Sequence, residues 1–68
     1  MMKANLLKAH MALKGKNIVD IVDLLEISKS TMYRKLNGDS EFNRREIVLL
    51  INFLGISKDE AMNIFLNN

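Results

Sequence analysis

Cysteine is absent from the 68 residues of this chain, and histidine occurs only once, at His10. Disulfides, and zinc sites built from thiolates or several imidazoles, are therefore excluded as sources of stability. A chain of this length buries little apolar surface, so it usually needs such a staple, a partner subunit or closely packed helices. The sequence predicts one domain, residues 1–68, that is stabilised by helix packing and by self-association and holds no metal.

Glycines and capping residues divide the chain into helices, and no proline interrupts it. Each glycine follows a run of apolar residues with helical spacing, where a helix ends in a left-handed residue; they are Gly15, Gly38 and Gly55. Helix starts are marked by Asn17, Asn43 and Ser57, each followed three residues later by an acid, and the last two are typical of capping boxes. The five predicted helices span residues 3–14, 18–25, 29–37, 44–54 and 58–66.

The first two segments each need an interpretation of their apolar pattern. In the first helix, Leu6, Ala9 and Leu13 are expected to form the buried face. A strand over residues 18–22 is the alternative for the second segment, because β-branched residues favour sheets. The apolar residues there are Ile18, Ile21, Val22 and Leu25. Their spacing of i, i+3, i+4 and i+7 favours a helix.

Positive charge is concentrated in the middle of the chain. The net charge is +2, but residues 1–40 carry +3 and residues 41–68 carry −1. The stretch 27–38 contains Lys29, Arg34 and Lys35 and no acid. A basic surface of this kind is typical of a nucleic-acid interface, and a solvated helix face is the alternative.

The segment 17–38 is the most informative part of the sequence. It predicts two short helices joined by Leu25-Glu26-Ile27-Ser28, a connection short enough to require a steep crossing. Apolar residues spaced to form a core between the two helices are Ile21, Val22, Leu25, Ile27, Met32 and Leu36. Lys29, Ser30, Tyr33 and Arg34 are then left on the outer face of the second helix. This arrangement is typical of a helix-turn-helix, whose second helix enters the major groove of DNA.

The chain resembles the lambda-repressor-like family, the phage repressor and Cro type of regulators. The resemblance is carried by SKSTMYRKLNG at residues 28–38 and by Leu-Gly-Ile-Ser at residues 54–57, and it extends over nearly the whole chain. It implies an all-α, compact five-helix domain in which the second and third helices form the helix-turn-helix.

The resemblance also implies which residues contact DNA. In the family, bases are read from positions that hold Lys29, Ser30 and Arg34 here, and phosphates are met by residues before and after the two helices. The full predicted set is Asn17, Ser28, Lys29, Ser30, Thr31, Tyr33, Arg34, Asn37, Gly38 and Arg44. The chemistry agrees, since Lys and Arg donate to guanine and an aromatic ring can rest on a thymine methyl. Coverage of the core edge is the alternative role for Tyr33.

Two departures from the family pattern are informative. Glu26 stands where the family usually has glycine, so this residue is expected to adopt a left-handed backbone. The loop after Gly38 is often basic in the family but carries Asp39 and Glu41 here. Arg44 and its neighbour Arg45 are candidates for the missing phosphate contact, because cations are unfavourable at a helix N-terminus and suggest another role. The alternative is that both are ordinary surface arginines.

These patterns predict a DNA-binding transcriptional regulator, a repressor of phage or prophage type. It is expected to bind a palindromic operator in double-stranded DNA as a homodimer, in the cytoplasm on the nucleoid. No catalytic constellation is present, so neither enzymatic activity nor a cofactor is expected, and no apolar run is long enough for a membrane span.

The helix 44–54 supports a second interpretation. It is apolar nearly all round, which indicates that more than one of its faces is buried. A homodimer interface would explain this, with contacts predicted at Phe53, Met62, Phe65 and Leu66. A protein-interaction module on the same fold, acting on another regulator as an antirepressor or as an antitoxin, explains it equally well.

Overall fold

The computed structural model describes residues 2–66. The helices are α1 (Ala4–Leu13), α2 (Ile18–Leu25), α3 (Lys29–Leu36), α4 (Arg44–Leu54) and α5 (Lys58–Ala61), which continues into a π-helical segment, η1 (Met62–Leu66). No strand occurs within residues 2–66, so the predicted all-α, five-helix fold is confirmed and the strand alternative is wrong. The prediction of one regular helix over residues 58–66 missed the change to π-helix after Ala61.

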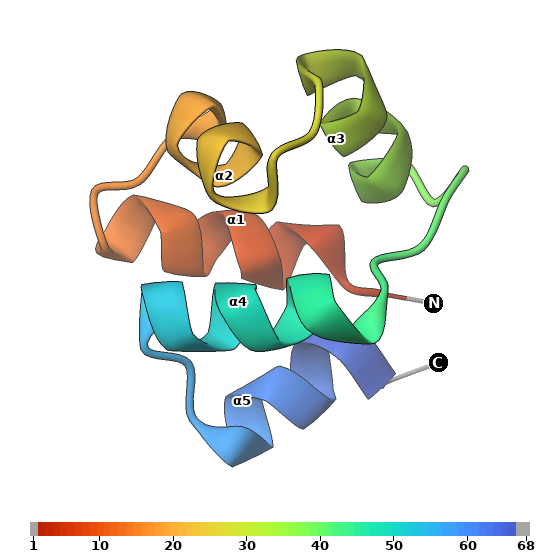
Figure 1. The fold of residues 1–68 in the computed structure, drawn as a ribbon. Coiled ribbons are helices and arrows are strands. Elements are labelled where there is room, and N and C mark those ends of the chain that lie inside the picture. Colours follow the sequence, from red (N-terminus) through yellow and green to blue (C-terminus); the bar gives the residue numbers. More distant parts are fainter. Residues whose placement is uncertain (1, 67–68) are drawn as a thin grey trace.

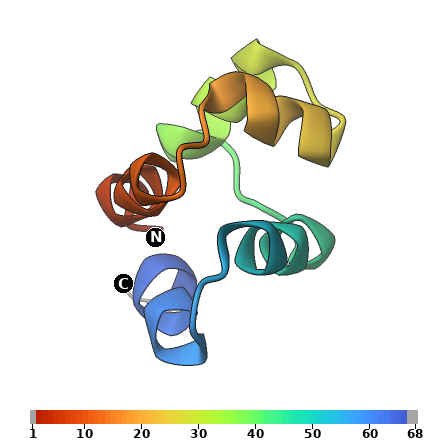
Figure 2. The ribbon, with the colours of Figure 1, turned by 90° about the vertical axis from the view of Figure 1, so that its left-hand side faces the viewer.

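The helices surround one core. In Figure 1, α2 and α3 lie above α1 and α4, and α5 lies below them. The view turned by 90° shows α1 and α4 close to end-on, on opposite sides of the molecule (Figure 2). The α2–α3 unit therefore covers one end of the core, and α5 with η1 covers the other. Within the described residues, no helix is both long enough and apolar enough to cross a membrane.

The predicted residues at the helix ends are confirmed as caps. The side chains of Asn43 and Ser57 cap α4 and α5 in complete capping boxes, and so does Asn17 at the start of α2, where Asp20 takes the place of the usual glutamate. The three glycines all have positive φ. Glu26 shares this conformation, with φ 58° and ψ 45°, as expected from its position in the family pattern.

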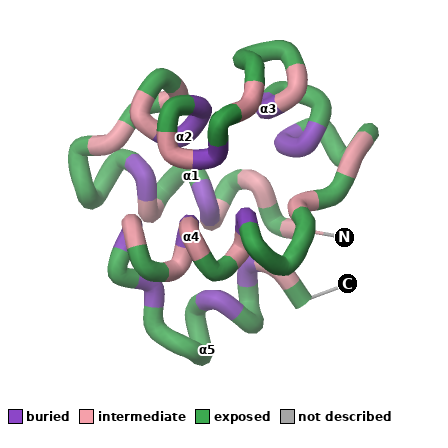
Figure 3. The backbone as a smooth tube through the Cα atoms, in the orientation of Figure 1, coloured by how far each residue is buried: buried purple, intermediate pink, exposed green. Residues whose placement is uncertain are grey.

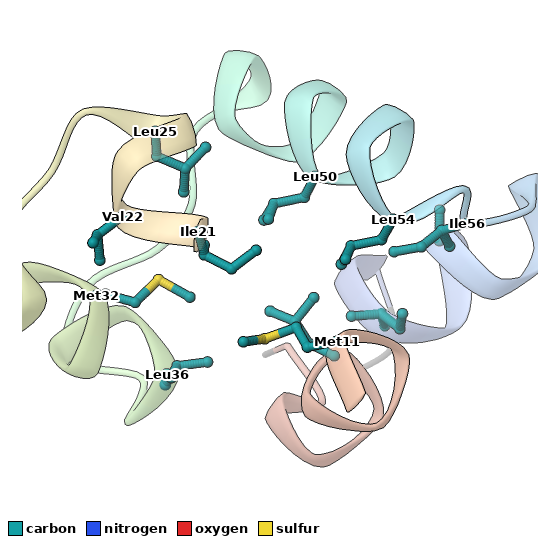
Figure 4. Packing of buried hydrophobic residues seen from close by; sticks show 12 residues of the cluster. Met11, Ile21, Val22, Leu25, Met32, Leu36, Leu50, Leu54 and Ile56 are labelled. Atoms are coloured by element: carbon teal, nitrogen blue, oxygen red, sulfur yellow. The ribbon is translucent and has the colours of Figure 1, made fainter. Parts of the chain in front are cut away.

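Leucine, isoleucine and methionine side chains fill the core between the helices (Figure 4). The side chains with almost no exposure are Leu7, Ile21, Leu25, Met32, Leu50, Leu54 and Ile64. The expected core of the α2–α3 unit is confirmed, with Ile27 only partly buried. Figure 3 shows these buried positions along the inner sides of the helices.

The predicted buried face of α1 is wrong. Leu7 and Met11 face the core, whereas Leu13 is 78% exposed and Ala9 is also exposed. Leu6 lies at the edge of the core. Both sets of residues have helical spacing, and the choice between them depends on the packing of η1 against α1, which the local pattern does not contain.

Candidate nucleic-acid interface

Three residues connect α2 to α3. The N–H groups of Glu26 and Ile27 both donate to the carbonyl of Val22, so α2 ends at one left-handed residue, Glu26. Ser28 then begins α3, since its Oγ accepts a hydrogen bond from the N–H of Thr31 at 3.1 Å. The connection is short because a cap on each side satisfies the free backbone groups. It fixes the direction in which α3 leaves α2.

The outward side of α3 is polar and basic. Its exposed residues are Lys29, Ser30, Tyr33 and Arg34. The Tyr33 side chain is half exposed, so it does not serve mainly to cover the edge of the core. Among residues 2–66, neither Lys29 nor Arg34 takes part in an ion pair. Two cations without a counter-charge therefore lie on one exposed helix, as the sequence indicated, while their contacts with DNA stay a prediction.

Three hydroxyl groups lie together at the start of α3. The Oγ of Ser28 lies 3.2 Å from the Oγ of Ser30 and donates to the Oγ1 of Thr31 at 2.9 Å. Ser28 is therefore used mainly to begin the helix, and Thr31 is partly buried. Of the three predicted contact residues here, Ser30 is the one whose hydroxyl is exposed and is not a cap.

The predicted phosphate contact at the start of α2 has an acid beside it. Asn17 is exposed, but its Oδ1 accepts from the N–H of Asp20, and its own N–H donates to Asp20 Oδ2 at 2.9 Å. The carboxylate thus lies at the helix end where a phosphate would bind, and like charges repel there. The Asn17 contact stays a prediction that must overcome this charge.

At the end of α3, a backbone group that was predicted to contact phosphate makes a hydrogen bond within the chain. Asn37 and Gly38 are exposed, but the N–H of Gly38 donates to the carbonyl of Lys35 at 3.3 Å. Asp39 closes the turn by donating its N–H to the carbonyl of Arg34 at 2.9 Å. The Asn37 amide is thus the better candidate for a phosphate contact at this end.

The two arginines at the start of α4 differ in their surroundings. Arg45 lies 3.5 Å from the carboxylate of Glu26, and both side chains are well exposed. Arg44 is exposed and takes part in no ion pair among the described residues. Arg44 is therefore the freer candidate for a phosphate contact.

Lys35 does not contribute to the basic surface, contrary to the sequence interpretation. Its side chain is 9% exposed, and its Nζ lies 3.1 Å from Oε1 of Glu46. The same Nζ donates to the carbonyl of Glu41 at 2.9 Å and lies 5.5 Å from the centroid of the Phe42 ring. The signal was present in the sequence, because position 35 follows the buried Met32 by three residues and so shares its helix face.

The sequence model of the BetR domain matches residues 3–65, a range that contains α1 to α5 and most of η1. The chain belongs to the BetR domain family. Neither the comparison with curated proteins nor that with solved structures found a match for this BetR domain.

Most of the apolar surface of α4 in this BetR domain is buried within the chain itself. Leu50 and Leu54 are fully buried, and Leu49, Ile51 and Phe53 pack at the edge of the core. Ile47 is partly buried and lines a hollow beside the end of α3. Val48 is the α4 apolar side chain left about half exposed. The apolar residues of α4 are therefore explained mainly by packing within the chain, and a partner protein is needed to cover fewer of them than the sequence suggested.

The predicted dimer residues of the BetR domain divide into two groups. Phe65 packs edge-to-face on Phe42, with ring centroids 6.2 Å apart, and Phe53 lies under the Nζ of Lys16. Met62 and Leu66 are 49% and 68% exposed. The two exposed side chains on η1 are therefore the ones available to a second chain.

Proposed function

We propose that this BetR domain is a sequence-specific DNA-binding regulator of the lambda-repressor-like kind, with α2 and α3 as its helix-turn-helix. The observation that carries the proposal is the exposed side of α3, where Lys29 and Arg34 have no counter-charge within the described residues. Cations on a firmly capped helix are well suited to bind base edges, because the backbone that carries them is already ordered and loses little conformational entropy on binding.

The chemistry of this side fits the major groove. The groove is wide enough for one α-helix, and Arg or Lys can donate to O6 and N7 of guanine. Ser30 can donate or accept, and the Tyr33 ring can contact a thymine methyl. In this proposal α3 enters with its N-terminal end first, which brings Lys29 and Ser30 to the bases and lets Arg34 reach them one turn later.

Around this helix, Asn17, Asn37 and Arg44 would position the domain by phosphate contacts. Such contacts fix register and carry no direct sequence information. A homodimer on a palindromic operator would present two copies of α3 to successive major grooves. Occupancy of the operator, in the cytoplasm on the nucleoid, would then block transcription without a cofactor or any catalytic step.

Selection of binding sites from a pool of random duplexes tests the proposal. The purified protein is expected to enrich one sequence family, with half-sites centred about 10 base pairs apart. A pool that remains random after several rounds, at a salt concentration where the protein still binds DNA, contradicts sequence-specific binding.

The second candidate function is a protein-interaction module acting on another regulator. Met62 and Leu66 favour it, because exposed apolar side chains on one short segment are suited to a protein surface. If no DNA sequence is enriched, this alternative is the one supported.

A further inference from the structure

Lys35 joins three parts of the fold at one atom. Its Nζ pairs with Glu46 in the first turn of α4 and donates to the carbonyl of Glu41 in the loop before α4. Oε1 of Glu46 also accepts from the N–H of Asn43 at 2.9 Å, so the ion pair is coupled to the cap of α4. The buried ammonium therefore connects the last turn of α3, the loop and the start of α4.

Few other contacts fix the end of α3 relative to α4. α2 packs closely against both α3 and α4, whereas α3 and α4 are not among the closely packed helix pairs. A hollow of about 280 Å³ lies beside the end of α3, lined by Leu36, Phe42 and Phe65 among others. Leu36 anchors this end of α3 in the core, and the Lys35 side chain supplies its polar contacts to the loop and to α4.

A buried ion pair of this kind is a poor explanation for stability. Removing two charges from water costs about as much free energy as their attraction returns, so apolar replacements are often neutral. What the pair adds is direction, because two of the three N–H donors of the ammonium have acceptors at fixed places in the fold. In this structure those acceptors belong to the loop and to α4.

We propose that Lys35 is a positioning residue, which through Glu46 sets the orientation of α3 relative to α4 and hence the specificity of DNA binding. The inference rests on the proposed function, because the orientation of α3 affects base contacts only if α3 is the helix that reads DNA. Lys35 itself is buried, so in this proposal it would not contact a base. Its removal should therefore weaken discrimination between sequences more than it weakens attraction to DNA.

The variant that tests this is Lys35→Met combined with Glu46→Gln. Methionine keeps most of the apolar stem, and glutamine keeps the capping box of α4. Lys35→Met alone is unsuitable because it would leave Glu46 buried without a counter-charge, which destabilises strongly. The matched control is Lys8→Met combined with Asp23→Asn, which likewise removes one positive and one negative charge, from exposed positions on α1 and α2.

Two measurements give separate outcomes. Residual dipolar couplings of backbone amides should show that α3 is reoriented or averaged relative to α4 in the double variant, with the melting temperature close to that of the wild type. The ratio of affinities for the selected consensus duplex and for a random-sequence duplex should fall at least about fivefold, the loss expected for one impaired base contact. Lys8→Met combined with Asp23→Asn should leave the couplings and the ratio unchanged.

Unchanged couplings, or an unchanged ratio in the double variant, overturn the positioning role. If the wild type selects no consensus, the proposed function itself fails, and the couplings then show separately whether Lys35 orients α3.

Discussion

Glu26 has a backbone conformation that its side chain disfavours. It is the one non-glycine residue within 2–66 with positive φ, and the turn between α2 and α3 depends on that conformation. Its carboxylate gains only an exposed ion pair with Arg45 at 3.5 Å. Exposed pairs of this kind contribute little to the free energy of unfolding. The backbone requirement therefore outweighs the side-chain contact at this position.

We therefore expect Glu26→Gly to leave the free energy of unfolding unchanged or to raise it by up to about 1 kcal/mol, because glycine removes the left-handed strain. Glu26→Ala is the control, since it also breaks the ion pair but keeps a Cβ and the strain. Urea denaturation of both variants measures the difference. A glycine variant that is less stable than the alanine variant would contradict the left-handed strain assigned to Glu26.

At the scale of helices, capping boxes begin α2, α4 and α5. In the last of these, the backbone N–H of Ser57 donates to Glu60 at 2.9 Å, and this bond is the main reason that the pKa of Glu60 lies below its ordinary value of 4.5. The Ser57 hydroxyl and the nearby His10 and Lys14 lower the pKa further. Helix α5 is thus stabilised by a carboxylate that must be ionised.

The sign of the pH dependence follows from this lowered pKa. Glu60 stabilises the fold fully above the pKa of the unfolded chain, and the contribution is lost as pH falls through the lower folded pKa. The melting temperature of the wild type should therefore fall as pH drops below the ordinary pKa of 4.5, and Glu60→Gln should reduce that fall. Asp23→Asn, at an exposed site on α2, serves as the control. Parallel curves for Glu60→Gln and the wild type would contradict the capping role.

The burial of α1 gives a second prediction for an element. Leu7→Ala should lower the free energy of unfolding by at least about 2 kcal/mol, because it leaves a cavity in the core. Leu13→Ala should change it by less than about 0.5 kcal/mol, since Leu13 is largely exposed. Equal losses in urea denaturation would show that α1 is turned differently about its axis.

These elements show where sequence reasoning succeeds and where it stops. Caps and glycines act within a few residues, so the helix bounds could be predicted from the residues themselves. The left-handed Glu26 was implied by the resemblance to the lambda-repressor-like family. The buried face of α1 and the partner of Lys35 depend on residues distant in the chain, at η1 and Glu46. The exposed side of α3 was predictable because Met32 and Leu36 mark its buried side, although the burial of Lys35 on that side was missed. Asp20 was expected to cap α2 and to point away from DNA, but it lies at the helix end where a phosphate would bind.

For the whole molecule, self-association is expected through η1. Met62→Glu combined with Leu66→Glu should shift the protein from dimer to monomer in sedimentation experiments, because both side chains are exposed and charges there would repel. Their effect on folding should be small. Leu13→Glu, a charge at an exposed apolar site on α1, is the control. A wild type that stays monomeric at high concentration, both free and on DNA, would contradict the prediction.

The central claim for the whole molecule is that the exposed side of α3 reads bases. Selection of binding sites from random duplexes, carried out in parallel with the wild type, Arg34→Ala and Arg44→Ala, tests it most directly. Arg34→Ala should relax the consensus at one base pair and cost about 1–3 kcal/mol on the wild-type site. Arg44→Ala should keep the consensus and bind all sequences more weakly. The slope of log K against the logarithm of salt concentration should become less steep by about one unit. An Arg34→Ala variant that selects the unchanged consensus, with weaker binding alone, would contradict base reading by α3 at this residue.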